Sequence, residues 1–256
     1  EQVTVCLSGT GGDELFGGYS RYSKTLSLEK IRKLPLFIKK SLAFGYSFIN
    51  KHSSQKIETV LQSKNLAESY IRLFSYLLGD EHILIKNHDK IIKELSKHFS
   101  YKNELSNMLN FDMEFYIPDS LLVKEDRATM AHSLEGRVPF LDHELVELAN
   151  SISPALKIKG GETKYILKKA LENYLPKDIL YREKQGFGVP IDHYFRNELK
   201  DFVYHQIFDF DDFEYYDKKE IKKMWDKYQS GNFDYSVLFW VLMMFNLWYK
   251  GYIIDS

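Results

Sequence analysis

The sequence predicts a predominantly helical α/β protein, in which the last strand or strands of a parallel sheet are followed by a helical subdomain. Two observations support this fold class. The stretch "VTVCL" (residues 3–7) is a short apolar run, typical of a strand buried in a parallel sheet. It leads directly into the glycine-rich "SGTGG", after which strand signals are scarce and apolar residues recur at helical spacing. We therefore expect a strand, a tight turn and then a series of helices.

The helices are predicted from apolar periodicity and from residues that start or end helices. Asp142 is a candidate N-cap for "HELVELANSI", and Pro176 is expected to end the helix that precedes it. The acidic-aromatic stretch at 208–217 is interpreted as a solvated connection, and residues 186–190 as a loop. In chain order, one helix is predicted to open within 13–22, one to span 66–78, and one, with looser periodicity, to span 83–95. Further helices are predicted to start at Pro118-Asp119-Ser120 and to span 143–152 and 164–174, and a buried helix is predicted at 234–249.

Composition limits the partners and the compartment. The 256 residues suit one large domain or one large and one small domain. Lys and Arg total 35 against 36 Asp and Glu, and this balance argues against a nucleic-acid partner. Cys6 is the single cysteine, so no intramolecular disulfide can form, which fits the reducing cytoplasm. The most apolar run, residues 237–248, is too short to span a bilayer comfortably, so no membrane association is expected.

The glycine-rich turn predicts an anion site. Glycines let backbone N–H groups approach a phosphate, and a following helix N-terminus adds a favourable dipole. The stretch is neither a Walker A sequence nor a dinucleotide fingerprint. Asp13 and Glu14 would repel a bare phosphate but would suit Mg²⁺ already bound to phosphate. From these residues alone, a merely tight strand-to-helix turn is an equal alternative.

Two further stretches concentrate charge. Residues 121–144 pack opposite charges between apolar residues, and for Glu135 and Arg137 structural ion pairs are the favoured interpretation. In "YREKQGFGVPID" (residues 181–192), Lys184 precedes a Gly-Phe-Gly turn that could hold its ammonium over a pocket, although a lone loop lysine is usually just solvated. No histidine pair has zinc-hydrolase spacing, and Cys6 is more typical of core than of a nucleophile.

In this order, four stretches resemble the synthetase domain of the glutamine-dependent asparagine synthetases. The stretches are "LSGTGGDELFGGYSRY", "PDSLLVKEDRATMAHSLEGRVPFLDHELVELA", "KYILKKAL" and "LPKDILYREKQGFGVPI". The resemblance implies an ATP pyrophosphatase-type (adenine nucleotide alpha hydrolase-like) parallel sheet. It also implies that residues 1–256 are the carboxy-terminal part of the synthetase domain. We expect the glutaminase domain and the pyrophosphate loop to lie upstream of this chain, because neither is present in it and a lone parallel strand needs neighbours.

The activity that the resemblance implies is the ATP-dependent amidation of aspartate to asparagine. ATP would adenylate the side-chain carboxylate to β-aspartyl-AMP, and ammonia from glutamine would then displace AMP. The implied cofactors are ATP and Mg²⁺, and the partners are aspartate, ATP and ammonia. A homodimer is compatible with the resemblance. This chain alone is expected to be inactive in that reaction.

The resemblance also implies the site residues. Lys184 matches the lysine that neutralises charge developing on the phosphates, which is an electrostatic role. Asp13 is expected to help bind Mg²⁺-pyrophosphate, and Arg127 and Glu135 are interpreted as structural residues. At the turn, the nucleotide and the acceptor carboxylate, both anionic, must come close enough to react, and small residues allow this approach. The residues expected to bind ATP and substrate are Ser8, Gly9, Thr10, Gly11 and Gly12.

One position departs from the family pattern. Many members have an acid where this sequence has Thr10, and that acid is associated with the substrate or with proton removal from the incoming amine. A threonine cannot be a general base near neutral pH, so the acceptor or its placement is expected to differ. The alternatives are a β-lactam synthetase-like or other carboxylate-amidating enzyme, and a non-catalytic helical interaction module of the same fold. Asp13 together with Lys184 argues against the module.

Overall fold

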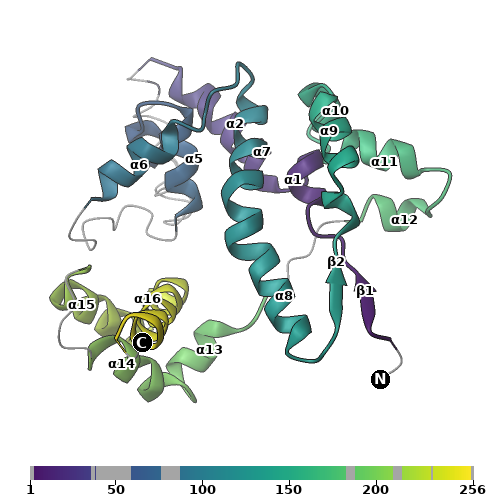
Figure 1. The fold of residues 1–256 in the computed structure, drawn as a ribbon. Helices are drawn as coiled ribbons and strands as arrows, with labels where there is room; N and C mark the ends of the chain where they lie inside the picture. The colour runs from purple at the N-terminus through teal and green to yellow at the C-terminus, as the bar shows by residue number, and fades with distance from the viewer. Residues whose placement is uncertain are drawn as a thin grey trace. The chain divides into compact units, whose positions relative to one another are not determined.

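A computed structural model describes residues 3–35, 38, 59–75, 87–182, 188–209, 215–231 and 233–254. The chain forms two compact units (Figure 1). The first comprises Glu1–Tyr70 and Glu94–Lys184, and the second comprises Ile71–Lys93 and Gln185–Ser256. Helices α5 (Leu66–Phe74) and α6 (His88–Ser96) cross the boundaries between these segments, and the two units are described separately below.

The first unit holds both described strands and most of the helices. Its elements, apart from the shared α5 and α6, are β1 (Val5–Leu7), α1 (Gly12–Phe16), α2 (Ser20–Arg32), α7 (Glu104–Phe111), the π-helix η2 (Asp112–Leu122), α8 (Val123–Met130), β2 (Glu135–Arg137), the 3-10 helix η3 (Pro139–Leu141), α9 (His143–Ser151), α10 (Pro154–Lys157), α11 (Tyr165–Leu171) and α12 (Lys177–Leu180).

The sheet consists of β1 and β2 in a parallel pair, with Cys6 opposite Gly136. The predicted strand is confirmed in the shorter range of β1, but β2 was not predicted, because "EGR" carries no apolar signal. The expected burial of the strand is wrong: the side chain of Leu7 is 73% exposed and Cys6 is half-buried. Parallel strands are normally covered on both faces, and the described residues leave Val5 and Leu7 of β1 exposed.

One continuous helical rod, α7–η2–α8, leads to β2 (Figure 1). The predicted helix start at residues 118–120 is wrong, because Pro118 lies inside η2. Proline lacks the N–H that an α-helix needs and crowds the preceding turn. A π-type segment is one of the irregularities that interrupt the regular helical hydrogen-bond ladder, so the chain keeps a helical path through Pro118 instead of ending there.

The predicted cap of the helix at 143–152 is confirmed, whereas the helix predicted at 164–174 is shorter than expected. The side chain of Asp142 accepts a hydrogen bond from the Glu144 backbone N at 3.0 Å and caps α9. Helix α11 begins at Tyr165 and ends at Leu171, a few residues before Pro176. Helix α9 packs its apolar side against α1, where Leu15, Phe16 and Ala149 form a small buried core.

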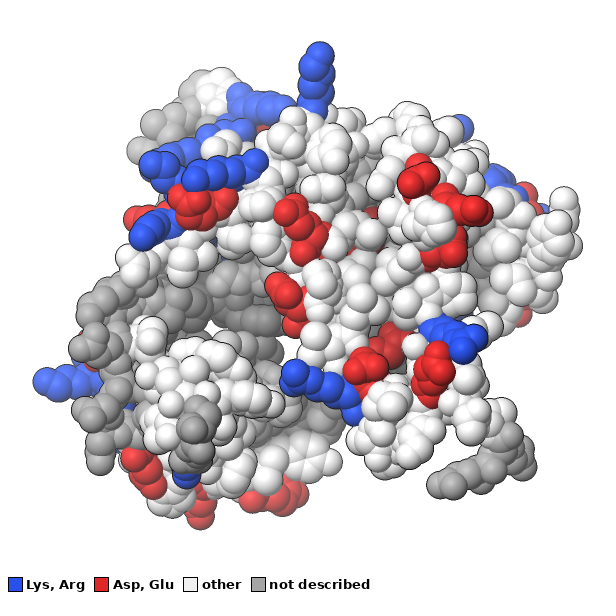
Figure 2. Space-filling view, viewed as in Figure 1, with Lys and Arg blue, Asp and Glu red and all other residues white. Residues whose placement is uncertain are grey.

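Acidic and basic side chains lie next to one another on the surface drawn in Figure 2. Exposed ion pairs of the first unit include Lys33 with Glu104 at 2.8 Å and Lys97 with Glu94 at 2.5 Å. Exposed pairs of this kind add little to stability, typically below about 1 kcal/mol. The surface charge is thus mixed on this face, in keeping with the near-zero net charge of the chain.

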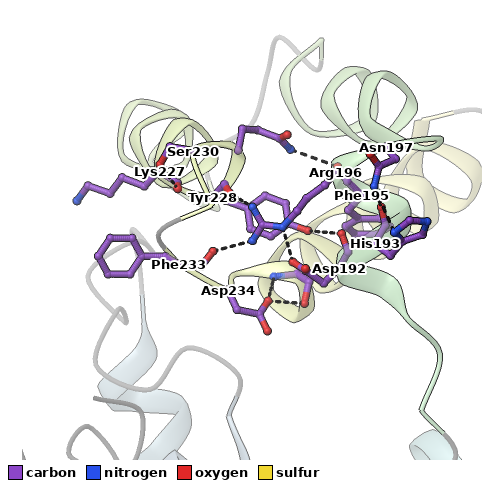
Figure 3. Close-up of polar contacts among 12 residues, drawn as sticks. Asp192, His193, Phe195, Arg196, Asn197, Lys227, Tyr228, Ser230, Phe233 and Asp234 are labelled. Carbon is purple, nitrogen blue, oxygen red and sulfur yellow. Dashed lines mark hydrogen bonds and ion pairs between the residues drawn. The ribbon is translucent and has the colours of Figure 1, made fainter. Parts of the chain in front are cut away.

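The second unit is helical and has its own core. Its remaining elements are α13 (Ile191–Arg196), α14 (Lys200–Phe208), α15 (Lys218–Gln229), α16 (Ser236–Tyr249) and the π-helix η4 (Lys250–Ile254). Phe195, Trp225 and Phe239 are buried at its centre. Figure 3 shows how Arg196 ties the unit together. Its guanidinium donates to the carbonyls of Tyr228 and Phe233 and to the carboxylate of Asp192, and lies over the ring of Tyr228.

The last helix is longer than the apolar run that was judged too short for a membrane span. Together α16 and η4 form a 19-residue apolar helix from Ser236 to Ile254, which by length and composition could cross a membrane. Several residues of this helix, among them Leu238, Phe239 and Leu242, pack in the core of the second unit. Core helices of globular domains meet the same criteria, so length and composition alone are weak evidence of a membrane span. Only 28% of the apolar window is buried, so the helix predicted to be buried at 234–249 packs one side in the core and leaves the other side exposed.

Candidate functional site

The loop of residues 8–12 connects the carboxyl end of β1 to the N-terminus of α1. The backbone N of Ser8 donates to the carbonyl of Arg137 on β2 at 2.8 Å, which fixes the start of the loop. Gly11 has φ +93°, a conformation that favours glycine, and a side chain there would meet Leu141 at 2.4 Å. Helix α1 then begins at Gly12, as predicted. The predicted strand, turn and helix start are therefore confirmed.

Asp13, predicted as a metal ligand, lies in the first turn of α1 and is ion-paired. Its Oδ1 is 2.8 Å from the Nζ of Lys164, the residue just before α11. Lys164 has φ +55°, which is uncommon for a residue with a side chain. A Cβ on Gly18 would lie 1.8 Å from Asp13 Oδ1 and 2.3 Å from Lys164 Cε, so the pair is packed against the Gly18 backbone. Lys164 was not predicted as a site residue.

Thr10 joins the loop to helix α8. Its hydroxyl donates to Glu125 Oε2 at 2.5 Å, and Ser8 Oγ lies 3.0 Å from Thr10 Oγ1. The side chains of all three residues are half-buried. Glu125 was not predicted as a site residue and is one of several charges in residues 121–144. This contact joins residues 115 positions apart and places the carboxylate of Glu125 next to the hydroxyl of Thr10.

Glu14, the second acid after the turn, points into the protein. It is buried and accepts a hydrogen bond from the Tyr19 hydroxyl at 2.6 Å. Burial raises the pKa of Glu14, because it disfavours the charged form, and the hydrogen bond from Tyr19 opposes that rise. Glu14 is therefore part of the support beneath the loop.

A fully buried carboxylate, Asp112 at the start of η2, anchors the helix that follows α1. It accepts hydrogen bonds from the hydroxyls of Tyr22 and Tyr70 and pairs with Arg21 at 2.5 Å. Burial raises the pKa of Asp112, while Arg21 and the phenols lower it. The Arg21 guanidinium also lies 4.1 Å from the ring centre of Tyr19. These contacts position α2 and η2 around α1.

The remaining predicted residues divide into two groups. Lys184 lies outside the described residues, so its placement stays a prediction. Glu135 and Arg137 lie on β2 and pair with each other at 2.8 Å on the surface, which agrees with the structural interpretation. Arg127 is exposed on α8.

The donor set of the loop fits one type of metal site. The described residues contain no group of three or more His, Cys, Asp or Glu side chains that could hold a metal. Mg²⁺ in nucleotide sites keeps several waters and binds one or two carboxylates together with substrate phosphates. Asp13, a carboxylate in a first helical turn beside Lys164, fits a Mg²⁺ that arrives with phosphate. It is the residue that would hold the metal.

The arrangement defines a class of protein: an α/β protein with a polar loop between the carboxyl end of a parallel strand and the N-terminus of a helix, the usual ligand position in such sheets. The asparagine synthase family model matches residues 1–250. The chain therefore belongs to the asparagine synthase family.

Named relatives agree with this family. The chain is 32% identical to asparagine synthetase [glutamine-hydrolyzing] 1 of Bacillus subtilis, over 98% of this chain and 41% of that protein. It is 31% identical to a putative asparagine synthetase [glutamine-hydrolyzing] of Mycobacterium bovis, over 100% of this chain and 40% of that protein. A rat asparagine synthetase [glutamine-hydrolyzing] is 41% identical over 38% of this chain and 18% of that protein. The chain thus spans about two-fifths of the length of the first two relatives. No solved structure gives a significant match.

Proposed function

We propose that this chain is part of an enzyme that amidates aspartate to asparagine at the expense of ATP, through an acyl-adenylate. Family membership supports the reaction class. The observation that carries the proposal is the loop of residues 8–12, which leaves a parallel strand and enters a helix with Asp13 in its first turn. Such a loop can bring the phosphates of ATP and the carboxylate of aspartate together without side chains between them.

Each loop residue has a proposed role. Ser8, Gly9, Thr10, Gly11 and Gly12 would line the junction between nucleotide and acceptor. The N-terminus of α1 would offer its backbone N–H groups to phosphate oxygens. Mg²⁺, when bound, supplies positive charge that stabilises the departing pyrophosphate.

Two cations would balance the charge of the phosphates. Lys164 lies 2.8 Å from Asp13 and would remain beside that carboxylate when phosphate and metal arrive. Lys184, as predicted from "EKQGFGVP", would neutralise charge at the bond between the α- and β-phosphates. A compact ammonium at that bond would stabilise the transition state more than the bound ground state.

The proposal includes the context of the complete protein. A glutaminase domain and a pyrophosphate loop would be supplied by the part that the relatives have beyond the matched region. The sheet would be of the ATP pyrophosphatase type, and the enzyme would work in the cytoplasm, with a homodimer as a candidate assembly. The chain alone would synthesise no asparagine.

The test is aspartate-dependent exchange of labelled pyrophosphate into ATP by the complete polypeptide. We expect exchange with aspartate, and a loss of about a hundredfold or more in Lys184→Ala, as for other preorganised charges. Lys184→Arg should restore part of the rate, because its planar fork places charge differently from an ammonium. Exchange with another carboxylate instead of aspartate would favour a β-lactam synthetase-like or other amidating enzyme. No exchange with any carboxylate would favour a non-catalytic module.

A further inference from the structure

Helix α8 delivers a carboxylate to the loop of residues 8–12. Glu125 Oε2 accepts a hydrogen bond from Thr10 Oγ1 at 2.5 Å, although the two residues are 115 positions apart in the sequence. A Cβ on Gly136 would lie 3.5 Å from Glu125 Oε1, so β2 runs beside the other oxygen of the same carboxylate. The carboxylate is therefore held between the loop and the strand that pairs with β1.

The hydrogen bonds around Thr10 have a direction. The Thr10 hydroxyl has one proton and donates it to Glu125. In the 3.0 Å contact between the hydroxyls of Ser8 and Thr10, Ser8 must then be the donor. The backbone N of Thr10 in turn donates to Ser8 Oγ at 3.2 Å. The result is a chain of two hydroxyls that points from Ser8 through Thr10 to the carboxylate of Glu125.

The other acids near the loop have different environments. Asp13 lies 2.8 Å from the Lys164 ammonium, a pairing suited to a metal and phosphate role. Glu14 is buried, where its carboxylate accepts from the Tyr19 hydroxyl. Among the described residues, Glu125 is the carboxylate that the hydroxyls of the loop contact.

We propose that Glu125 accepts the proton that is released when ammonia attacks the activated acyl group, and that Ser8 and Thr10 relay this proton. This inference rests on the proposed function. The nitrogen lone pair forms the C–N bond to the acyl carbon, and the bond from that carbon to the phosphate oxygen breaks, so that AMP leaves with the electron pair. One of the three ammonia protons passes to Ser8 Oγ, the Ser8 proton passes to Thr10, and the Thr10 proton passes to Glu125. The amide keeps two protons and both hydroxyls are restored.

This arrangement accounts for the departure at position 10. A threonine there cannot act as the base, but it can pass a proton to one. The acid lies on α8 instead of in the loop, and the hydroxyl of Thr10 bridges the distance to it. The reaction class is then unchanged, and the acceptor need not differ.

The experiment separates the two half-reactions in the complete enzyme. Adenylation is followed as aspartate-dependent pyrophosphate exchange, and acyl transfer as hydroxamate formation from hydroxylamine, a nucleophile that bypasses glutamine. We expect Glu125→Gln to lose at least about a hundredfold in hydroxamate formation while exchange changes by less than about threefold. Thr10→Val, which keeps the shape of the side chain but breaks the relay, should lose at least about tenfold in the same step.

Two readouts exclude a merely structural effect. Glu125→Asp, which keeps a carboxylate on α8, should recover part of the hydroxamate formation that Glu125→Gln loses. The double variant Thr10→Glu with Glu125→Gln, which moves the carboxylate into the loop, should recover part of the rate. Glu147→Gln, an exposed acid on α9, is the matched control and should leave both half-reactions unchanged.

The outcomes distinguish this inference from the proposed function. Absence of exchange in the wild-type enzyme would overturn both. Normal exchange with unchanged hydroxamate formation in Glu125→Gln would overturn only the relay. An equal loss of both half-reactions in Glu125→Gln would also overturn it, because Glu125 would then act by supporting the fold of the loop.

Discussion

At the scale of single residues, the missing side chain of Gly18 leaves room for the ion pair between Asp13 and Lys164. A Cβ there would lie 1.8 Å from Asp13 Oδ1, whereas a Cβ on Gly9 would meet nothing within 4 Å. Gly18→Ala should therefore displace the ion pair between Asp13 and Lys164. A displacement of about 1 Å at a reacting site can cost about a hundredfold in rate, and we expect a loss of that order in pyrophosphate exchange by the complete enzyme.

The same substitution should also destabilise the fold, by about 1 kcal/mol, because the side chains of Asp13 and Lys164 must move away from the new methyl group and lose their partly buried ion pair. Gly9→Ala is the control for this measurement and should change the free energy of unfolding by less than about 0.5 kcal/mol. Equal unfolding midpoints for the two variants in urea would contradict the close approach at Gly18.

Lys157, at the end of α10, is a second residue whose environment predicts a measurable effect. Its side chain is 4% exposed, and burial lowers its pKa to about 8. Below that pH the side chain is charged in both the folded and the unfolded state, and folding must bury the charge. Between pH 8 and the ordinary value of 10.5, the folded state loses this proton first, so the unfolded state binds more protons and stability rises with pH.

We therefore expect Lys157→Met to stabilise the protein at neutral pH by up to about 3 kcal/mol, since one pKa unit corresponds to about 1.4 kcal/mol. The gain should disappear as the pH rises above 10.5. Urea unfolding at neutral and at alkaline pH measures it. Lys177→Met, at an exposed position on α12, is the control and should give no pH-dependent gain. A constant difference between Lys157→Met and wild type over this pH range would show that the ammonium is not buried.

At the scale of elements, α9 supports the loop of residues 8–12 through its contact with α1. The Asp142 side chain satisfies the backbone N of Glu144 at the start of α9. Asp142→Ala removes this acceptor and should cost about 1 kcal/mol in the free energy of unfolding. Asp142→Asn keeps a side-chain oxygen at the same place and should cost only a few tenths of that value. Similar unfolding midpoints for the alanine and asparagine variants would mean that the cap does not contribute.

The sequence predicts an element when the interactions that form it lie within a few residues. It misses an element when those interactions involve distant parts of the chain. The turn after β1 and the cap at Asp142 were predicted because glycine conformation and capping act within a few residues. The strand β2 was missed because "EGR" becomes a strand only by pairing with β1. The helix start at Pro118 was wrong because the rod α7–η2–α8 absorbs the proline in a π-helical segment.

The residues of the site divide in the same way, into those that a local motif predicts and those that depend on the packing of distant helices. Asp13 and the glycines were predicted from a contiguous motif, and they lie in the predicted turn between β1 and α1, while their binding roles stay a prediction. Glu125 and Lys164 come from helices far along the chain, and their contacts with Thr10 and Asp13 depend on how α8 and α11 pack around α1. No local pattern carries that information, although Lys164 does lie within one of the stretches that resemble the family.

At the scale of the whole molecule, the chain divides into two units with separate cores. Each has a polar network of its own. In the first unit, the Tyr22 hydroxyl donates to Asp112, which is fully buried. In the second, Arg196 donates to the carbonyl of Phe233 at 2.9 Å and lies 4.0 Å from the ring centre of Tyr228. Compact units with separate cores can unfold in separate cooperative steps.

We therefore expect thermal unfolding to show two transitions that respond to different substitutions. Tyr22→Phe leaves Asp112 with one donor fewer and should cost about 1–3 kcal/mol in the first unit alone. Arg196→Lys cannot reproduce the planar fork that reaches two carbonyls and should cost about 2 kcal/mol in the second unit alone. Calorimetry of the two variants and of their combination measures this. If each variant lowered the same single transition, the units would unfold as one cooperative body; if the two shifts fell on different transitions and added in the combination, the two cores would be energetically independent.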